Sequence, residues 1–131
     1  MHIIYQQSKP YKMQSYIIRK TNEIYYENGD YYCGSIRHNM ANGFGKKIYA
    51  DGMVYNGDWK KGIYHGYGEL IYNNNEKYKG MFKNGQREGH GTYIWKNGTI
   101  YIGKWRKDEI NGYGSVQSCV DLTRIHTCMW S

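Results

Sequence analysis

Polar and apolar positions alternate over short stretches of this chain, and the same alternation returns every 23 residues. Tyr55, Gly57 and Trp59 alternate with polar residues, which is the period-two pattern of a half-buried strand. After Lys61-Gly62 a second alternation places one set of residues on a single face: Gly66, Gly68, Leu70 and Tyr72. Two short strands separated by a turn predict an antiparallel hairpin.

This hairpin motif occurs four times in strict register. Each copy opens with a Tyr, carries a Gly two positions later, and reaches a Gly-x-Gly 11 positions after the Tyr. The opening residues are Tyr32, Tyr55, Tyr78 and Tyr101, and the glycine pairs are Gly43/Gly45, Gly66/Gly68, Gly89/Gly91 and Gly112/Gly114. A fixed period of this length indicates a repeat architecture, in which each unit packs against its neighbours.

Turn residues occur at two fixed places in the period. In the middle of the hairpins the four units offer only residues that tolerate a positive φ, namely Asn39, Gly62, Gly85 and Asp108. Between units the chain carries Asn28-Gly29, Asp51-Gly52, Asn74-Asn75 and Asn97-Gly98. Since Asn-Gly and Asp-Gly between strands favour tight turns, the units are predicted to follow one another as a continuous meander.

The repeated glycines have a second predicted role, in packing. Gly57 shares a face with Tyr55, and we expect Gly66 and Gly68 to share a face with Leu70. Because glycine has no Cβ, a ring from a neighbouring strand can lie against the backbone there. A phosphate-binding glycine loop is not expected, since that loop needs a third Gly and the start of a helix, and these copies run into strands.

Composition changes one expectation. Only 21 of the 131 residues are Ile, Leu, Val or Phe, and the net charge is +7, values that are typical of disordered chains. The chain nevertheless contains 16 Tyr and 4 Trp, whereas disordered segments are poor in aromatic residues. We therefore expect a folded protein whose core is built from Tyr and Trp rings.

These motifs resemble the MORN repeat, whose pattern is Tyr-x-Gly-x-aromatic, a turn glycine, Gly-x-Gly and a closing Asp-Gly or Asn-Gly. The resemblance covers about residues 32–118 and departs from the pattern at Ile36, Asn39, Asn75, Asp108 and Ser118. It implies an all-β fold, namely an elongated single-layer antiparallel meander of stacked 23-residue β-hairpins. At about 4.8 Å per strand, four hairpins give a ribbon on the order of 40 Å long.

The repeat divides the chain into three predicted parts. Residues 1–23 are an N-terminal extension, expected to be a covering strand, a short helix or disordered. The array spans 24–118, with a half unit at 24–31 and full units at 32–54, 55–77, 78–100 and 101–118. Residues 119–131 form a tail or cap, which we expect to lie over the last hairpin because an uncovered edge invites aggregation.

No constellation of catalytic residues emerges. His2, His38, His65, His90 and His126 are scattered without metal-ligand spacing, and the 11 acidic residues form no repeated pair. No Ser or Cys has a recognisable base nearby in the sequence. We therefore expect neither an enzyme nor a bound cofactor or metal. Cys33, Cys119 and Cys128 are expected to be free thiols of a reducing compartment, with a Cys119–Cys128 pair left open.

The charge pattern predicts a second surface. Basic residues end the first strand of every unit: Arg37 (followed by His38), Lys60, Lys61, Lys83, Arg106 and Lys107. Because the register is fixed, these residues should stack about 10 Å apart along the hairpin tips. Two interpretations stay open, an anion-binding row and a solvated rim that discourages edge pairing.

Function is inferred from the resemblance and from these two surfaces. The resemblance implies a non-catalytic scaffold or protein-interaction module of cytoskeletal, ciliary or membrane-associated assemblies. Its docking surface would be the aromatic face: Tyr55, Trp59, Tyr72, Tyr78, Phe82, Trp95, Tyr101 and Trp105. One alternative is binding of acidic phospholipids (phosphoinositides) through the basic row, and another is a regulatory fragment of a larger enzyme.

Partners and location follow the same reasoning. We expect a protein partner, with an anionic membrane surface as the second candidate. Nucleic acid is not expected, because the aromatic rings are committed to the stack. Homodimerisation, edge to edge or face to face, stays open. The sequence has no apolar run long enough to span a membrane and no secretory signal, so we expect an intracellular, cytoplasmic protein at the cytoskeleton, a cilium or a membrane surface.

Overall fold

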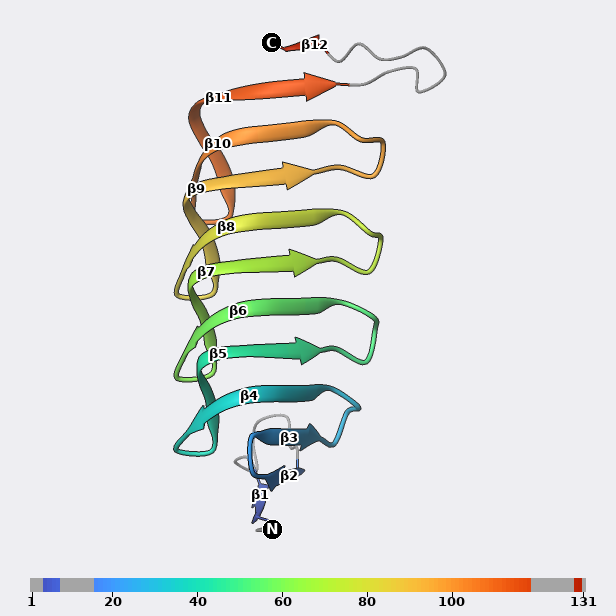
Figure 1. Cartoon of the computed structure of the whole chain (residues 1–131), viewed down its shortest axis with the longest axis vertical. Helices are drawn as coiled ribbons and strands as arrows, with labels where there is room; N and C mark the ends of the chain where they lie inside the picture. Colours follow the sequence, from blue (N-terminus) through green and yellow to red (C-terminus); the bar gives the residue numbers. More distant parts are fainter. Residues whose placement is uncertain (1–3, 8–15, 119–128, 131) are drawn as a thin grey trace.

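The computed structural model describes residues 4–7, 16–118 and 129–130, with side chains described from Ile18 to Ser118. The described residues form twelve strands in one antiparallel sheet, and their order in space is their order in sequence (Figure 1). The strands are β1 (Ile4–Gln7), β2 (Tyr16–Lys20), β3 (Glu23–Tyr26), β4 (Tyr31–Arg37), β5 (Met40–Ile48), β6 (Val54–Lys60), β7 (Ile63–Ile71), β8 (Lys77–Lys83), β9 (Gln86–Ile94), β10 (Ile100–Arg106), β11 (Glu109–Ser118) and β12 (Met129–Trp130). The predicted all-β, single-layer meander of hairpins is confirmed.

The hairpin of each full unit closes at its tip through a two-residue turn in which both central residues have a positive φ. In the second unit φ is 51° at Lys61 and 81° at Gly62. Such type I′ turns match the twist of the flanking strands. The predicted left-handed residues at the other tips are also confirmed: Asn39, Gly85 and Asp108. The preceding positions are left-handed as well, although the sequence pattern did not single them out: His38, Asn84 and Lys107.

Three-residue turns link the units. In the link after the first unit, Gly52 N–H donates to the Tyr49 carbonyl, and Tyr49 N–H donates to the Met53 carbonyl. The Asp51 carboxylate accepts the Met53 N–H at 2.9 Å. The other links repeat this contact through the Asn28, Asn74 and Asn97 side chains. The acidic or amide residue of each link therefore holds the turn with its own side chain.

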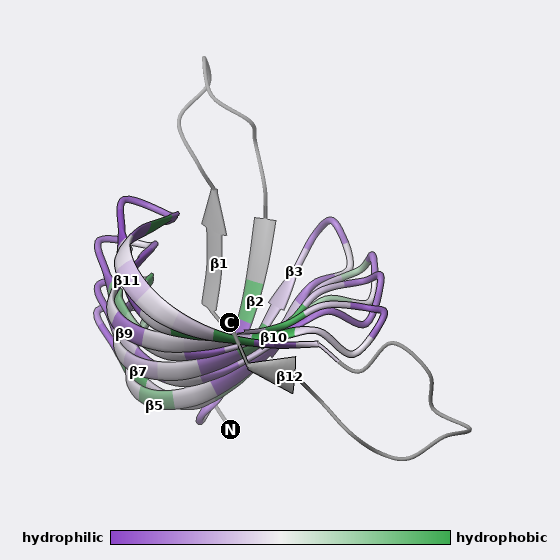
Figure 2. Ribbon diagram, turned by 90° about the horizontal axis from the view of Figure 1, so that it is seen from above, coloured by the Kyte–Doolittle hydropathy of each residue, from purple (hydrophilic) through white to green (hydrophobic). Residues whose placement is uncertain are grey.

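A bulge at the same place in each full unit bends the sheet. Between the Gly57–Gly68 pair and the Trp59–Tyr64 pair, one residue of β6 lies opposite three residues of β7. The same register shift occurs in the β4–β5, β8–β9 and β10–β11 hairpins. Because bulges bend and twist a strand, the repeated shift folds every hairpin in the same way. Figure 2 shows the result, an open trough seen along the stack with mainly hydrophilic turns along both rims.

Glycine occupies one position in each strand from β4 to β11, and these glycines pair with one another across the sheet. This glycine row consists of Gly34, Gly45, Gly57, Gly68, Gly80, Gly91, Gly103 and Gly114. A Cβ at Gly68 would overlap the Tyr55 ring. The expectation that Gly66 shares this face was wrong. A Cβ there would meet Asp58 at 3.1 Å instead, because Gly66 sits in the bulge with a φ of 91°.

The core lies inside the trough, on the face that we call the inner trough. Tyr32, Tyr55 and Tyr78 are fully buried there, although the sheet is a single layer. The Tyr55 hydroxyl donates to the Asp58 carbonyl at 2.8 Å, and the Tyr78 hydroxyl donates to the Met81 carbonyl at 2.8 Å. Each ring is therefore buried while its polar tip stays hydrogen-bonded.

Candidate functional site

Aromatic rings join successive units within the inner trough. Trp59 of the second unit lies edge-on to Tyr32 of the first, with the ring centroids 5.4 Å apart and the planes at 87°. The Tyr55–Phe82 and Tyr78–Trp105 pairs repeat this arrangement at 5.3 Å. The Trp59 indole N–H also donates to the Gly45 carbonyl at 3.0 Å. Since edge-to-face pairs add to the energy of burial, each unit stabilises the one before it.

The eight predicted aromatic residues come together in the inner trough, but with two levels of exposure. Six are buried against one another: Tyr55, Trp59, Tyr78, Phe82, Tyr101 and Trp105. Tyr72 and Trp95 are half-buried and occupy the same position in successive units, beside the link turns. The part of the predicted aromatic face that stays open to a partner is therefore centred on Tyr72 and Trp95.

Two further tyrosines belong to this surface and were not among the predicted site residues. Tyr64 stacks face to face on Tyr55, with the centroids 3.9 Å apart and the planes at 11°. Its hydroxyl hydrogen-bonds to that of Tyr49, which belongs to the opposite arm of the trough. Burial raises the pKa of the Tyr49 phenol. The 23-residue period could have identified Tyr49, because it is the equivalent of Tyr72.

Nothing in the period marks Tyr64, because its equivalents share no chemistry: Ala41, Arg87 and Ile110. In the third unit Arg87 takes its place among the rings. The guanidinium carbon lies 4.6 Å from the centre of the Trp105 ring. Nε donates to the Asp108 carboxylate at 3.1 Å, and Nη2 donates to the Asp108 carbonyl at 2.7 Å. Arg87 is thus held by an aromatic face and an acid together.

Lys47 is a second cation in the inner trough, at the position that Leu70 occupies in the next unit. Its Nζ lies 4.3 Å from the centre of the Tyr26 ring and 3.7 Å from the Asp30 carboxylate. Burial lowers the pKa of Lys47, and the Asp30 charge opposes that shift. Together with Tyr49 and its neighbours, Lys47 borders a shallow hollow of about 180 Å³. The inner trough therefore combines aromatic faces with Arg87 and Lys47, and aromatic residues and Arg are enriched at protein interfaces.

The predicted basic residues lie at the hairpin tips, and all of them are exposed: Arg37, Lys60, Lys61, Lys83, Arg106 and Lys107. With His38 they form what we call the basic rim. Hydrogen bonds between successive tips hold them in line, since Gly62 N–H donates to the Ala41 carbonyl at 2.8 Å and Gly85 N–H donates to the Tyr64 carbonyl at 3.0 Å.

A hollow of about 330 Å³ lies between the first two tips of the basic rim. It is lined mainly by cations and polar groups, and its lining includes Arg37, His38, Lys60 and Lys61. The structure therefore brings four of the basic-rim residues around one concave site.

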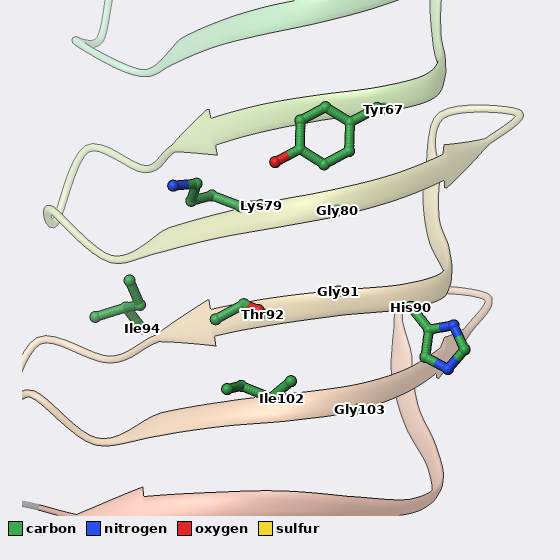
Figure 3. A pocket seen from close by; sticks show the side chains of 9 residues that line it. All are labelled: Tyr67, Lys79, Gly80, His90, Gly91, Thr92, Ile94, Ile102 and Gly103. Atoms are coloured by element: carbon green, nitrogen blue, oxygen red, sulfur yellow. The ribbon is translucent and has the colours of Figure 1, made fainter.

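The outer face of the sheet carries a third concavity, of about 370 Å³. Its floor is the glycine row at Gly80, Gly91 and Gly103, and its walls include Tyr67 and Lys79 (Figure 3). The lining mixes apolar, basic and hydroxyl groups, and none of its residues belongs to a predicted site. No pattern in the sequence predicted this hollow.

The described residues contain no group of three His, Cys, Asp or Glu placed to hold a metal ion. In the part of the chain that the structure describes, no helix has the length and apolar character of a membrane span. Cys33 is a free, exposed thiol. The open question of a Cys119–Cys128 pair lies outside the described residues.

Comparison with protein families identifies the repeat. The model of the MORN repeat matches residues 32–54, 55–77, 78–100 and 101–118. No curated protein matches the chain. MORN repeats are typically protein- or membrane-interaction modules, and the family is generally non-enzymatic. Because the four matched repeats cover more than half of its residues in the predicted pattern, this chain belongs to the MORN repeat family.

Proposed function

We propose that this chain is a non-catalytic scaffold that docks a partner protein in its inner trough, as part of a cytoskeletal, ciliary or membrane-associated assembly. The observation that carries the proposal is one half-buried aromatic position that recurs along the array, as Tyr49, Tyr72 and Trp95. The tip hydrogen bonds and the glycine row fix the spacing of these rings. Preorganised rings supply contact area at a low cost in conformational entropy, and aromatic residues are enriched at interfaces.

Affinity purification with three baits tests this function. The baits are the wild type, a Tyr72→Ser/Trp95→Ser variant and a Lys60→Glu/Lys61→Glu variant. Serine should be tolerated because Ser118 holds the equivalent position in the fourth unit. At physiological salt we expect the wild type and the Lys60/Lys61 variant to retain one stoichiometric protein that the Tyr72/Trp95 variant loses. Equal recovery by all three baits, or no specific protein with any of them, would count against docking in the inner trough.

Binding of acidic phospholipids through the basic rim is the second candidate, favoured by the hollow of about 330 Å³ among Arg37, His38, Lys60 and Lys61. Near an anionic surface each basic residue contributes roughly 1 kcal/mol, so the rim would give a salt-sensitive affinity. Sedimentation with phosphoinositide-containing liposomes should pull down the wild type and not a Lys60/Lys61/Arg106/Lys107→Glu variant. Equal sedimentation of both proteins, or of neither, removes this candidate.

A further inference from the structure

Strand β11 presents an open edge at the end of the array. On one side it pairs with β10, and on the other, within the described residues, β12 pairs only with Gln117 and Ser118 (Figure 1). The stretch 109–115 is exposed. Gly114 is exposed too, whereas its equivalents are buried: Gly45, Gly68 and Gly91. An edge of this kind offers a row of backbone hydrogen-bonding groups to an added strand.

The chain itself shows three times which strand covers such an edge. The closing strands β5, β7 and β9 are each covered by the first strand of the next unit, which is β6, β8 and β10 respectively. In the β7–β8 pair, Gly80 lies opposite Gly68, Tyr78 opposite Leu70, and Phe82 opposite Gly66. Transferred to β11, this register places a glycine opposite Gly114, a tyrosine opposite Val116 and an aromatic residue opposite Gly112.

Side chains show why the aromatic residue would be a tryptophan. The Trp59 indole donates to the Gly45 carbonyl at 3.0 Å, and the Trp105 indole donates to the Gly91 carbonyl at 3.3 Å. Gly114 carries the carbonyl at the same position of the last unit. Tyr101 is only 3% exposed, so burial of its ring adds little. The affinity must therefore come from backbone pairing and from the indole contacts.

From these three templates, two of which carry the tryptophan, we infer that β11 is a docking edge for an extended partner strand that carries Tyr-x-Gly-x-Trp, the opening strand of another array of this kind. The partner pairs antiparallel with the stretch 112–116, which β12 leaves uncovered. Addition of a strand to an open edge uses backbone hydrogen bonds for affinity and alternate side chains for specificity. This edge is separate from the inner trough, so it would add a second binding site to the proposed scaffold.

The test uses the intact chain and a synthetic peptide of residues 53–61, which contains Tyr55, Gly57 and Trp59. Titration followed by amide hydrogen exchange should show saturable binding and slower exchange in 109–116, with β5, β7 and β9 unchanged. A matched peptide with Trp59→Leu should bind about ten-fold more weakly, because it lacks the indole hydrogen bond and ring contact.

Variants of the protein supply the controls. Tyr113 is 97% exposed, so Tyr113→Ala should keep peptide binding, whereas Tyr113→Pro should weaken it by constraining the strand between Gly112 and Gly114. If Tyr113→Pro fails to fold, the affinities of the two peptides for the wild-type protein still test the inference. The inference is overturned by no saturable binding, by equal affinity of both peptides, or by protection outside 109–116. It is also overturned if the free chain forms a dimer in solution in which the two β11 edges pair with each other, because β11 then binds its own copy and not a Tyr-x-Gly-x-Trp strand.

Discussion

The ring of Tyr78 covers Gly91 so closely that a Cβ at Gly91 would overlap its hydroxyl and ring edge. The ring cannot easily move away, because its hydroxyl donates to the Met81 carbonyl and its face meets the edge of another ring, Trp105. Gly91→Ala should therefore lower the free energy of unfolding by roughly 3 kcal/mol, as overpacking of a core does. Denaturant unfolding followed by tryptophan fluorescence measures this change.

Gly52→Ala is the matched control for that substitution. Nothing lies within 4 Å of a Cβ at Gly52, but its φ is +100°. Only the backbone strain remains there, at about 1–2 kcal/mol. Equal losses for Gly91→Ala and Gly52→Ala would show that the contact with the Tyr78 ring does not explain the glycine row.

Trp59→Phe tests the coupling between neighbouring units. Phe keeps a ring beside Tyr32 but leaves the Gly45 carbonyl without its indole donor, which lies 3.0 Å away in the wild type. The expected loss of unfolding free energy is about 1–2 kcal/mol. Trp105→Phe should cost less, since its hydrogen bond to Gly91 is longer, at 3.3 Å. An unchanged free energy of unfolding after Trp59→Phe would show that the indole hydrogen bond does not stabilise the contact between units.

Arg87→Tyr tests whether Arg87 can be replaced by the residue type that occupies the equivalent position in another unit. Tyr64 holds the same position in the second unit, so Arg87→Tyr should change the unfolding free energy by less than about 1 kcal/mol. Arg87→Lys should be worse by about 1 kcal/mol, because Lys lacks the planar fork that reaches both the Asp108 carboxylate and its carbonyl. Thermal unfolding of both variants decides the order, and a more stable Lys variant would contradict it.

Alkaline pH should unfold the array through its buried phenols. Burial is the largest cause of the raised pKa of two tyrosines. The pKa of Tyr26 rises from 10.0 to about 12, and the pKa of Tyr32 also rises to about 12. A raised folded-state pKa means that the neutral phenol is favoured by folding. Its stabilisation is complete below pH 10 and is lost as pH rises toward 12. Urea midpoints should fall steeply across this range, together with the tyrosinate absorbance change. A urea midpoint that stays constant across this pH range would contradict a core of buried, neutral phenols.

Much of the fold follows from residue types at fixed spacing. Asn39, Gly62 and Asp108 marked the tip turns because few residues tolerate a left-handed φ, and the structure confirms them. The bulge at Gly66 could not be predicted, because alternation alone assigns each residue a face and cannot show an inserted residue. The trough could not be predicted either, because the bulges that bend the sheet are not visible in the alternation.

The candidate site was harder to predict than the fold. Periodicity located the aromatic rings, but it could not separate the buried Tyr55 from the half-buried Tyr72, since that difference depends on the bend of the sheet. Lys47 and Arg87 break the repeat and were overlooked, although each lies among rings beside an acid. Exceptions to the period, rather than the period itself, therefore mark what is particular to this chain.

Side-chain footprinting of the purified complex shows which surface of the array the partner covers. Tyrosine and tryptophan modification would be quantified by mass spectrometry with and without the retained partner, alongside lysine acetylation at the tips. We expect the partner to protect Tyr72 and Trp95 and to leave Lys60 and Lys61 as reactive as in the free protein. Protection of Lys60 and Lys61 with Tyr72 and Trp95 unchanged would contradict docking in the inner trough and place the partner on the basic rim.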